Sequence, residues 1–313
     1  MDSGQKIREL VKALQQIIVG KDEAILLMLT ALVAGGHALL EDVPGVGKTL
    51  LAKSLAALIA GKFQRVQCTP DLLPTDITGT NIWNPQTGAF QFMPGPVFAH
   101  VLLADEINRA TPRTQSALLE VMEENQVTVD GVSRPVPSPF FTIATQNPVE
   151  YQGTFPLPEA QLDRFTLSFS LGYPSAEEEL QMLQRQRGGT MHQEIPPCIT
   201  TEEVLQLRQQ CRGVAVSQAV AEYIVNLVRA TREDNEISLG VSPRGTVALQ
   251  RSAQAYALLR SALGSGATGG DVYVLPDDVK FLAPYVLGHR IIPAGRRSRR
   301  AIIDRLLGTV PVP

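Results

Sequence analysis

The spacing of apolar residues divides the chain into two regions of different texture. Before about residue 172, short apolar runs alternate with helical or turn-rich stretches. Short strands interleaved with helices are typical of a mainly parallel α/β sheet that carries helices on its faces. The five predicted strands lie at residues 37–40, 65–68, 101–104, 140–144 and 165–169.

Helical periodicity predicts the other elements, and Asp22 is a candidate N-cap. In the second region the pattern is helical, and we see no strand pattern there. Helices are expected at residues 6–16, 22–35, 176–187, 201–212, 217–232, 243–262 and 276–287. We therefore predict an α/β domain, residues 1–172, followed by a smaller all-α domain, residues 173–313, with a hinge near Gly172.

Two β-hairpins are predicted inside the α/β domain, near residues 80–95 and 126–136. Residues 85–88 form the turn of the first, and Asp130-Gly131 is a strong turn signal for the second. A minimal sheet of this kind needs neither hairpin. They are either surface decoration or moving elements that face a partner or a pore, and the sequence leaves both readings open.

The sequence DVPGVGKT at residues 42–49 lies between the first predicted strand and a helical pattern. Strand, glycine-rich turn, Lys-Thr and helix form the layout of a phosphate-binding loop, or P-loop. Glycines let the backbone approach phosphates, and amide N–H groups at the helix start point at the anion. Lys48 would neutralise the β- and γ-phosphates of ATP, and the Thr49 hydroxyl would ligate Mg²⁺. The predicted nucleotide contacts are Pro44, Gly45, Val46, Gly47, Lys48, Thr49 and Leu50.

Asp42 departs from the usual P-loop pattern, which opens with glycine. A carboxylate at this position puts negative charge near the phosphates unless the side chain points away from them. The acid is tolerable there if its side chain faces outward, and the sequence leaves the role of Asp42 open.

Acidic and amide side chains follow two later strand patterns. Asp105 and Glu106 end the apolar run 101–104, so that strand would deliver two carboxylates at its C-terminal end. We predict that Asp105 holds Mg²⁺ through water and that Glu106 polarises the attacking water as general base. Asn147 follows the next strand and is the candidate for orienting this water. The alternative for Asn147 is a turn residue before proline.

Two arginines are candidates for extra positive charge at the γ-phosphate. Arg164 lies just before the last predicted strand, and Arg244 lies at the start of the helix 243–262. A lone arginine is usually a solvated surface charge. Phosphoryl transfer, however, gains greatly from an arginine that is supplied within a subunit or between subunits.

Composition and charge narrow the classes of function. The 313 residues are 44% hydrophobic and 19% charged, with a net charge of −3, which is ordinary globular composition without an electrostatic case for nucleic acid binding. The three cysteines and four histidines lack metal-ligand or redox spacing. The start of the chain has no hydrophobic export core, and no apolar run approaches the roughly 20 residues that span a bilayer. We therefore expect a cytoplasmic protein without direct membrane insertion.

In this order the motifs resemble those of the AAA+ ATPases, and specifically of the MoxR family, over essentially the whole chain. The resemblance implies a P-loop AAA+ core with a mainly parallel five-stranded sheet, followed by an all-α lid. It rests on the P-loop and on the sequences IVG at 18–20, DLLPTDITG at 71–79, DEINRA at 105–110, QNP at 146–148, GTFPLPEAQLDRF at 153–165 and SPR at 242–244.

The resemblance implies a role for each candidate residue. Asn147 matches the sensor-1 position, Arg164 matches the arginine finger that acts on a neighbouring subunit's nucleotide, and Arg244 matches sensor 2, which reports the γ-phosphate to the lid. The segment that packs on adenine is matched by Ile18, Val19 and Gly20.

The resemblance also implies assembly and partners. We expect a homo-oligomeric ring, a hexamer, with ATP and Mg²⁺ at each interface and the two hairpins facing the channel. Its work would be to remodel or activate a client protein, with a von Willebrand factor A domain protein as partner. Two alternatives stay open. One is a nucleic-acid motor, suggested by the arginines at 296–297 and 299–300, although a solvated tail or a subunit contact explains them better. The other is a nucleotide-gated scaffold with little turnover.

Overall fold

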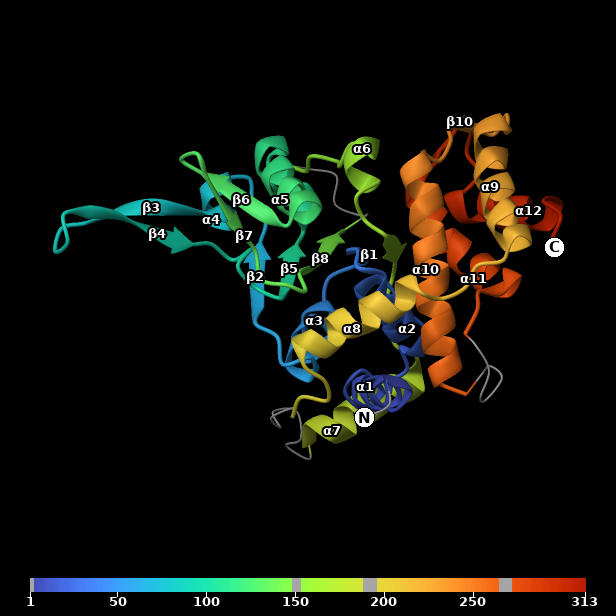
Figure 1. The fold of residues 1–313 in the computed structure, drawn as a ribbon, viewed down its shortest axis with the longest axis horizontal. Coiled ribbons are helices and arrows are strands. Elements are labelled where there is room, and N and C mark those ends of the chain that lie inside the picture. The colour runs from blue at the N-terminus through green and yellow to red at the C-terminus, as the bar shows by residue number, and fades with distance from the viewer. Residues whose placement is uncertain (1–2, 148–152, 188–195, 265–271) are drawn as a thin grey trace.

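The protein is built on a five-stranded parallel sheet with helices on both faces (Figure 1). The computed structural model describes residues 3–147, 153–187, 196–264 and 272–313. The strands are ordered β2-β5-β8-β1-β9, and every neighbouring pair is parallel. The five predicted strands are therefore confirmed. Their bounds are β1 Ala38–Glu41, β2 Phe63–Gln67, β5 Val101–Asp105, β8 Phe141–Gln146 and β9 Leu167–Phe169.

Helices cover both faces because the central strands are apolar on both sides. In β5, Leu103 belongs to one buried cluster and Leu102 to the other, and in β1 Leu40 and Leu39 divide in the same way. Successive side chains of a strand point to opposite faces, so an uninterrupted apolar run buries both of them. This pattern produces a sheet with two cores.

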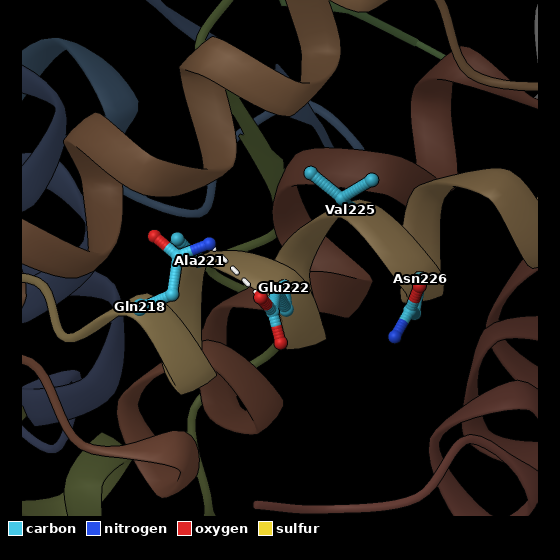
Figure 2. A pocket seen from close by; sticks show the side chains of 5 residues that line it. All are labelled: Gln218, Ala221, Glu222, Val225 and Asn226. Atoms are coloured by element: carbon cyan, nitrogen blue, oxygen red, sulfur yellow. Dashed lines mark hydrogen bonds between the residues drawn. The ribbon is translucent and has the colours of Figure 1, made fainter.

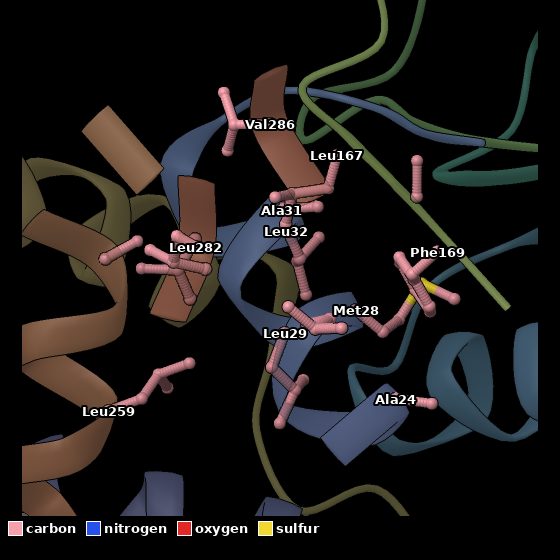
Figure 3. Close-up of a cluster of buried hydrophobic side chains, with 14 of the residues drawn as sticks. Ala24, Met28, Leu29, Ala31, Leu32, Leu167, Phe169, Leu259, Leu282 and Val286 are labelled. Atoms are coloured by element: carbon pink, nitrogen blue, oxygen red, sulfur yellow. The ribbon is translucent and has the colours of Figure 1, made fainter. Parts of the chain in front are cut away.

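The larger core continues from the sheet into the C-terminal helices. Figure 3 shows side chains of α2 packed between β9 and the helices α10 and α11. Leu29 and Leu32 of α2 lie in the same cluster as Leu167, Leu259 and Leu282, each at most 1% exposed. The C-terminal helices therefore pack on the sheet domain through a buried apolar contact.

All of the predicted helices are present, and their ends fall within a few residues of the predictions. α2 begins at Asp22 with Lys21 as its N-cap, so the prediction of Asp22 as N-cap is wrong by one position. The helices are α1 Ser3–Ile17, α2 Asp22–Ala34, α3 Lys48–Leu58, α4 Pro74–Thr78, α5 Pro112–Glu124, α6 Glu159–Leu162, α7 Ala176–Arg187, α8 Thr201–Arg212, α9 Gln218–Glu233, α10 Pro243–Ala262, α11 Pro276–Leu287 and α12 Arg299–Thr309. None of these described helices is long and apolar enough to cross a bilayer.

The C-terminal part contains a small sheet, which corrects the expectation that it is all-α. β10, Ile237–Leu239, pairs antiparallel with β11, Ile292–Pro293. Strands of three and two residues are too short to show the alternation on which a sequence-based prediction depends. Their pairing joins the segment after α9 to the segment before α12.

Both predicted hairpins are present. β3, Gly79–Asn84, pairs with β4, Ala89–Pro94, and β6, Gln126–Val129, pairs with β7, Val132–Pro135. The first hairpin projects far from the body of the molecule (Figure 1). It carries exposed apolar side chains, among them Trp83 at 52% and Phe90 at 71% exposure.

His37, just before β1, is a buried neutral histidine. Its Nδ1 accepts a hydrogen bond from the Thr142 backbone N–H at 3.0 Å, and its Nε2 lies 2.9 Å from the Met122 carbonyl oxygen, to which it donates. Burial lowers the pKa of His37 from 6.5 to about 4. The residue therefore holds three chain segments together only while it is uncharged.

This arrangement predicts acid sensitivity. Because the folded-state pKa lies below the unfolded value, the unfolded chain binds more protons, and stability is lost as the pH falls from about 6.5 towards 4. We expect about 2 kcal/mol of the free energy of unfolding to depend on His37 between about pH 7 and pH 5. Urea unfolding of the wild type and of His37→Gln at both pH values measures this term. Equal pH dependence of the two proteins would contradict it.

Candidate functional site

The P-loop connects the end of β1 to the start of α3. Gly45 and Gly47 have φ values of +88° and +95°, in the left-handed region that glycine adopts without strain. Nothing lies within 4 Å of a Cβ placed at either position, so the backbone conformation, and not a lack of space, requires glycine. Gly47 is the N-cap of α3 and has no side chain to cap the helix. The first-turn N–H groups thus face outward at the positive end of the helix, as an anion site requires.

The residues of the loop form a shallow surface with a buried lysine below it. Pro44 and Gly45 are exposed, Val46 and Thr49 are half-buried, and Leu50 is 41% exposed. Lys48 is only 8% exposed, and its Nζ donates to the Asp42 carbonyl oxygen at 3.1 Å. The amine is therefore hydrogen-bonded back to the first residue of the loop.

Asp42 is turned away from the loop amides but not towards solvent. Its Oδ2 accepts the Leu171 N–H at 2.6 Å and its Oδ1 accepts the Gly172 N–H at 3.0 Å. The residue is 5% exposed, so its carboxylate avoids the phosphate-binding amides by pointing into the protein, not outward. The carboxylate is directed to the chain after β9, at the predicted hinge.

Asp105 and Glu106 lie at the carboxyl end of β5, and Thr145 of β8 joins them. The Thr145 hydroxyl donates to Asp105 Oδ1 at 2.6 Å and accepts the Glu106 N–H at 2.9 Å. Arg65 Nη2 pairs with Asp105 Oδ2 at 2.7 Å. These contacts fix the direction of the Asp105 carboxylate.

Glu106 has an unusual backbone, with φ of +56°. A non-glycine residue in the left-handed region is strained, and such strain concentrates at functional sites. The Glu106 carboxylate accepts hydrogen bonds from Gln67 Nε2 at 3.0 Å and from Arg109 Nη1 at 3.1 Å. The strained turn thus holds the carboxylate between two strands and the short helix that follows it.

The strand order brings Asn147 between the P-loop and the two acids. β8 lies between β1 and β5, and Asn147 directly follows β8 in the sequence. It is 7% exposed. Ligands of parallel sheets bind at the carboxyl ends of the strands, where these three segments end. Pro148, the last residue of the QNP motif, lies outside the described residues.

Arg164 and Arg244 lie together on Glu123, near the end of α5. Arg164 Nε is 2.8 Å from Glu123 Oε2, and Arg244 Nη2 is 2.5 Å from Glu123 Oε1. The hydrogen bond from Arg164 is the main cause that lowers the pKa of Glu123. The structure therefore brings together two arginines that are 80 positions apart in the numbering of the chain.

The residue before Arg164 is tied to the C-terminal helices. Asp163 Oδ1 accepts from Arg290 Nε at 2.7 Å, and its Oδ2 accepts from the Ser242 hydroxyl at 2.7 Å. The Arg290 side chain is 2% exposed and also donates to the Phe165 carbonyl oxygen at 2.6 Å. Breaking a buried ion pair of this kind typically costs about 3–5 kcal/mol. The loop that carries Arg164 is consequently attached to the lid.

The segment predicted to pack on adenine lies between α1 and α2. Ile18 is 8% exposed, Val19 is half-buried and Gly20 is exposed. Gly20 has φ of +70°, and a Cβ there would overlap the Glu178 carboxylate of α7. This segment therefore lies against the start of α7, immediately after the predicted hinge.

Few side chains are placed to bind a metal ion, which suits an ion that keeps most of its bound water. No cluster of three or more His, Cys, Asp or Glu side chains that could hold a metal occurs among the described residues. Thr49 and Asp105 supply one hydroxyl and one carboxylate oxygen. Mg²⁺ is commonly bound by one or two carboxylates together with water and substrate phosphates, so these residues fit Mg²⁺ with a bound nucleotide.

One surface depression lies elsewhere and adds nothing to the site. It has a volume of about 310 Å³, and Figure 2 shows that its lining residues all come from one helix, α9. They are Gln218, Ala221, Glu222, Val225 and Asn226. None of the predicted site residues lines it, and an open face of one helix provides no enclosing wall for a ligand.

Sequence reasoning missed three side chains that organise the site. Thr145 could have been found, since it lies near the end of β8, two residues before Asn147, and the polar side chains at strand ends were the basis of the other predictions. Arg65 precedes its partner Asp105 by 40 positions, and only the pairing of β2 with β5 brings them together. Glu123 has no local signal, because both of its arginines come from other elements.

Comparison with known proteins agrees with this architecture. The family model described as "ATPase family associated with various cellular activities (AAA)" matches residues 37–167, and the AAA lid domain model matches residues 229–306. A solved structure of a candidate ATPase from Cytophaga hutchinsonii superposes with a TM-score of 0.90 at 38% identity, covering 99% of this chain and 96% of that one.

Curated relatives match over nearly the whole chain. The protein YeaC of Bacillus subtilis is 47% identical, over 97% of this chain and 93% of its own length. The chaperone MoxR1 of Mycobacterium tuberculosis is 41% identical, over 96% of this chain and 80% of its own length. The protein MoxR of Paracoccus denitrificans is 31% identical, over 98% and 96%. On this similarity, and with this fold, the chain belongs to the MoxR family of AAA+ ATPases.

Proposed function

We propose that the protein binds Mg·ATP at its P-loop, hydrolyses it in a ring of identical subunits, and uses turnover to remodel or activate a client protein. The observation that carries this proposal is the meeting of three strand ends. Lys48 follows β1, Asn147 follows β8, Asp105 ends β5 and Glu106 follows it. These three strands are adjacent in the sheet, in the order β5-β8-β1. A cation, an amide and two carboxylates at one sheet edge form the set that phosphoryl transfer to water needs.

The position of each site residue suits it to one role in ATP binding or hydrolysis. Lys48 and the loop amides would bind the phosphates, while Thr49 and Asp105 would hold Mg²⁺, which neutralises developing charge when bound. The Glu106 carboxylate would accept a proton from water that Asn147 orients. Arg65, through its ion pair, keeps the Asp105 carboxylate in one orientation.

The two arginines that meet on Glu123 would serve the nucleotide of the neighbouring subunit. Arg164 occupies the finger position, and Arg244 shares its carboxylate partner. Their proximity supports joint action on one γ-phosphate, in place of a separate role for Arg244 at its own subunit's nucleotide. Since both arginines would act in trans, isolated subunits should be poor ATPases.

The lid would move together with this arginine pair. Arg290 and Ser242 hold Asp163, the residue next to Arg164, from the lid side. A change in lid position would therefore displace the arginine loop of the same subunit. Hydrolysis at one interface would in this way affect the next.

The exposed β3–β4 hairpin is the surface that we assign to the client. It projects from the sheet domain and presents Ile82, Trp83, Phe90 and Met93, each at least 49% exposed. Exposed apolar patches of this kind mark protein contacts. The chaperone name of the 41% identical relative agrees with a protein client. A hexameric ring, a von Willebrand factor A domain partner and a cytoplasmic location belong to the same proposal.

A nucleic-acid motor receives less support from the structure. Arg297 pairs with Glu236 at 2.8 Å, and Arg300 pairs with Asp304 at 3.2 Å. Side chains in such pairs present less free positive charge to phosphates than an open basic patch does.

A nucleotide-gated scaffold with little turnover remains the second candidate. It is favoured by the contacts of Glu106, whose carboxylate is held by Gln67 and Arg109. Both contacts are made by Oε2, so if they persist with nucleotide bound, only Oε1 is left to accept a proton from water.

Steady-state phosphate release separates the two candidates. With Mg²⁺ and ATP we expect release whose rate per subunit rises with protein concentration, because the arginines come from a neighbour. Chelation of Mg²⁺ with EDTA should lower the rate by about a hundredfold or more, given the several kcal/mol that the metal contributes to the transition state. Tight binding of ATP without release at any protein concentration would support the scaffold and refute the ATPase.

A further inference from the structure

We propose that Asp42 is a positioning residue that couples the nucleotide site to the connecting segment, residues 171–173, between the sheet domain and α7. The inference rests on the proposed function, since it assumes that the P-loop binds nucleotide. Asp42 stands where the usual P-loop pattern has glycine, and glycine has no side chain that could make this connection.

Asp42 touches three parts of the protein through three different groups. Its backbone N–H donates to the Gln146 carbonyl oxygen at 3.1 Å, at the end of β8. Its backbone carbonyl oxygen accepts from Lys48 Nζ at 3.1 Å. Its carboxylate accepts the N–H groups of Leu171 and Gly172 at 2.6 and 3.0 Å. One residue thus connects the phosphate-binding lysine, the strand that leads to Asn147 and the connecting segment.

The hold on the connecting segment is strong and directional. The carboxylate is 5% exposed, and hydrogen bonds from amides to a buried ionised acceptor are stronger than those between neutral groups. Gly172 has φ of +64°, in the left-handed region, and open space lies where a side chain would be. The two amide bonds to Asp42 therefore act together with the burial of Leu171, which is 6% exposed, to set the backbone at the predicted hinge.

A second contact reaches the same segment from the other end of the nucleotide site. Lys21 Nζ donates to the Tyr173 carbonyl oxygen at 2.9 Å, directly after the segment 18–20 that is predicted to pack on adenine. Three successive backbone groups, of Leu171, Gly172 and Tyr173, are thus held by residues that border the phosphate side and the base side. Because contacts from both sides of the nucleotide site meet on this segment, we favour a role of Asp42 in coupling the site to the segment over a role confined to its own loop.

Nucleotide would act on this arrangement through Lys48. The amine that donates to the Asp42 carbonyl oxygen is the group that would bind phosphate, so occupancy changes the contacts of the loop in which Asp42 is anchored. An occupied, ordered loop fixes Asp42 more firmly. The Leu171 and Gly172 amides should then open less often, which hydrogen exchange measures directly.

The experiment measures hydrogen exchange at residues 171–172 in the full chain, with and without Mg²⁺ and a non-hydrolysable ATP analogue. In the wild type we expect the analogue to slow exchange about tenfold, the effect of one charge-assisted hydrogen bond. In Asp42→Asn, which keeps the shape but only one acceptor, basal exchange should be faster and the slowing should fall below about twofold. A fluorescent ATP analogue, titrated separately, gives the affinity of each protein, so that exchange is compared at equal occupancy of the nucleotide site.

Asp76→Asn is the matched control, because the Asp76 carboxylate also accepts a backbone N–H, that of Leu73 at 2.8 Å, but far from the connecting segment in sequence. It should behave as the wild type does. The coupling is refuted if Asp42→Asn retains the slowing, or if it loses nucleotide binding outright. It is also refuted if the wild type binds the analogue without any slowing at these amides, a result that does not depend on the stability of a variant. Failure of the wild type to bind nucleotide would instead overturn the proposed function itself.

Discussion

Replacement of Glu106 by glutamine should leave nucleotide binding intact and lower ATP turnover by about 10²–10⁴-fold, the range for removal of a general base. Glutamine preserves the shape of the side chain, and its amide oxygen can still accept from Gln67 or Arg109. It cannot take a proton from water. The loss should therefore appear in kcat and not in the affinity for ATP.

Lys48→Ala supplies the complementary result. Removing an ammonium group that binds phosphate should weaken ATP binding by about 10–100-fold, the value of one or two charge-assisted hydrogen bonds. Titration with a fluorescent ATP analogue and steady-state phosphate release measure the two quantities on both variants. Glu124→Gln, an exposed carboxylate of α5, controls for loss of charge alone.

The outcomes separate the assignments. A Glu106→Gln protein that hydrolyses ATP at the wild-type rate would show that Glu106 is not the base. A Glu106→Gln protein that no longer binds ATP would show that its contacts with Gln67 and Arg109 support the nucleotide site structurally. Full affinity of Lys48→Ala would remove Lys48 from the phosphate contacts.

The sequence predicted the fold where periodicity extends over several residues. Four of the five parallel strands and the predicted helices span four residues or more, and their ends were nearly correct, while β9, with three residues, was predicted from the longer run 165–169. The helices α5 and α12 were not predicted. β10 and β11 have three and two residues, so no periodicity exists to detect. The position of the lid on the sheet domain was not predictable either, because it depends on α2 packing against α10 and α11 (Figure 3).

In the candidate site, too, some residues could be predicted from the sequence and others could not. Lys48, Asp105 and Glu106 were predicted from local motifs. Each comes after an apolar run, and the residues next to it in the sequence complete a recognisable motif. The side chains that orient them come from elsewhere in the chain. Thr145 reaches Asp105 across neighbouring strands, and Asp42 reaches Leu171 over 129 positions, which only the folded topology determines.

Arg164→Ala should reduce turnover by about a thousandfold or more, the range for loss of an arginine finger. The reason is the loss of positive charge on the neighbour's γ-phosphate, and ATP binding to the variant should therefore change little. Arg229→Ala is the matched control, because Arg229 is an exposed arginine whose ion pair with Glu233 lies on the surface of α9.

Mixing variants tests whether the arginine acts between subunits. An Arg164→Ala subunit retains Glu106, and a Glu106→Gln subunit retains Arg164, so an interface formed by the two in the right order is complete. Phosphate release from the mixture should exceed the sum of the separate proteins and rise with total protein concentration. An inactive mixture would contradict action in trans, and so would an Arg164→Ala protein with full activity.

Arg244→Ala in the same assay tests the pairing on Glu123. If the two arginines act on one γ-phosphate, Arg244→Ala is also rescued by Glu106→Gln subunits, and the double variant loses less than the product of the two single losses, as expected for residues that share a partner. If Arg244 acts on its own subunit's nucleotide, every interface in the mixture lacks either Arg244 or Glu106, and Arg244→Ala is not rescued. Rescue in the mixture therefore decides between the two positions, and the shared carboxylate of Glu123, at 2.8 and 2.5 Å from the two guanidinium groups, predicts the first.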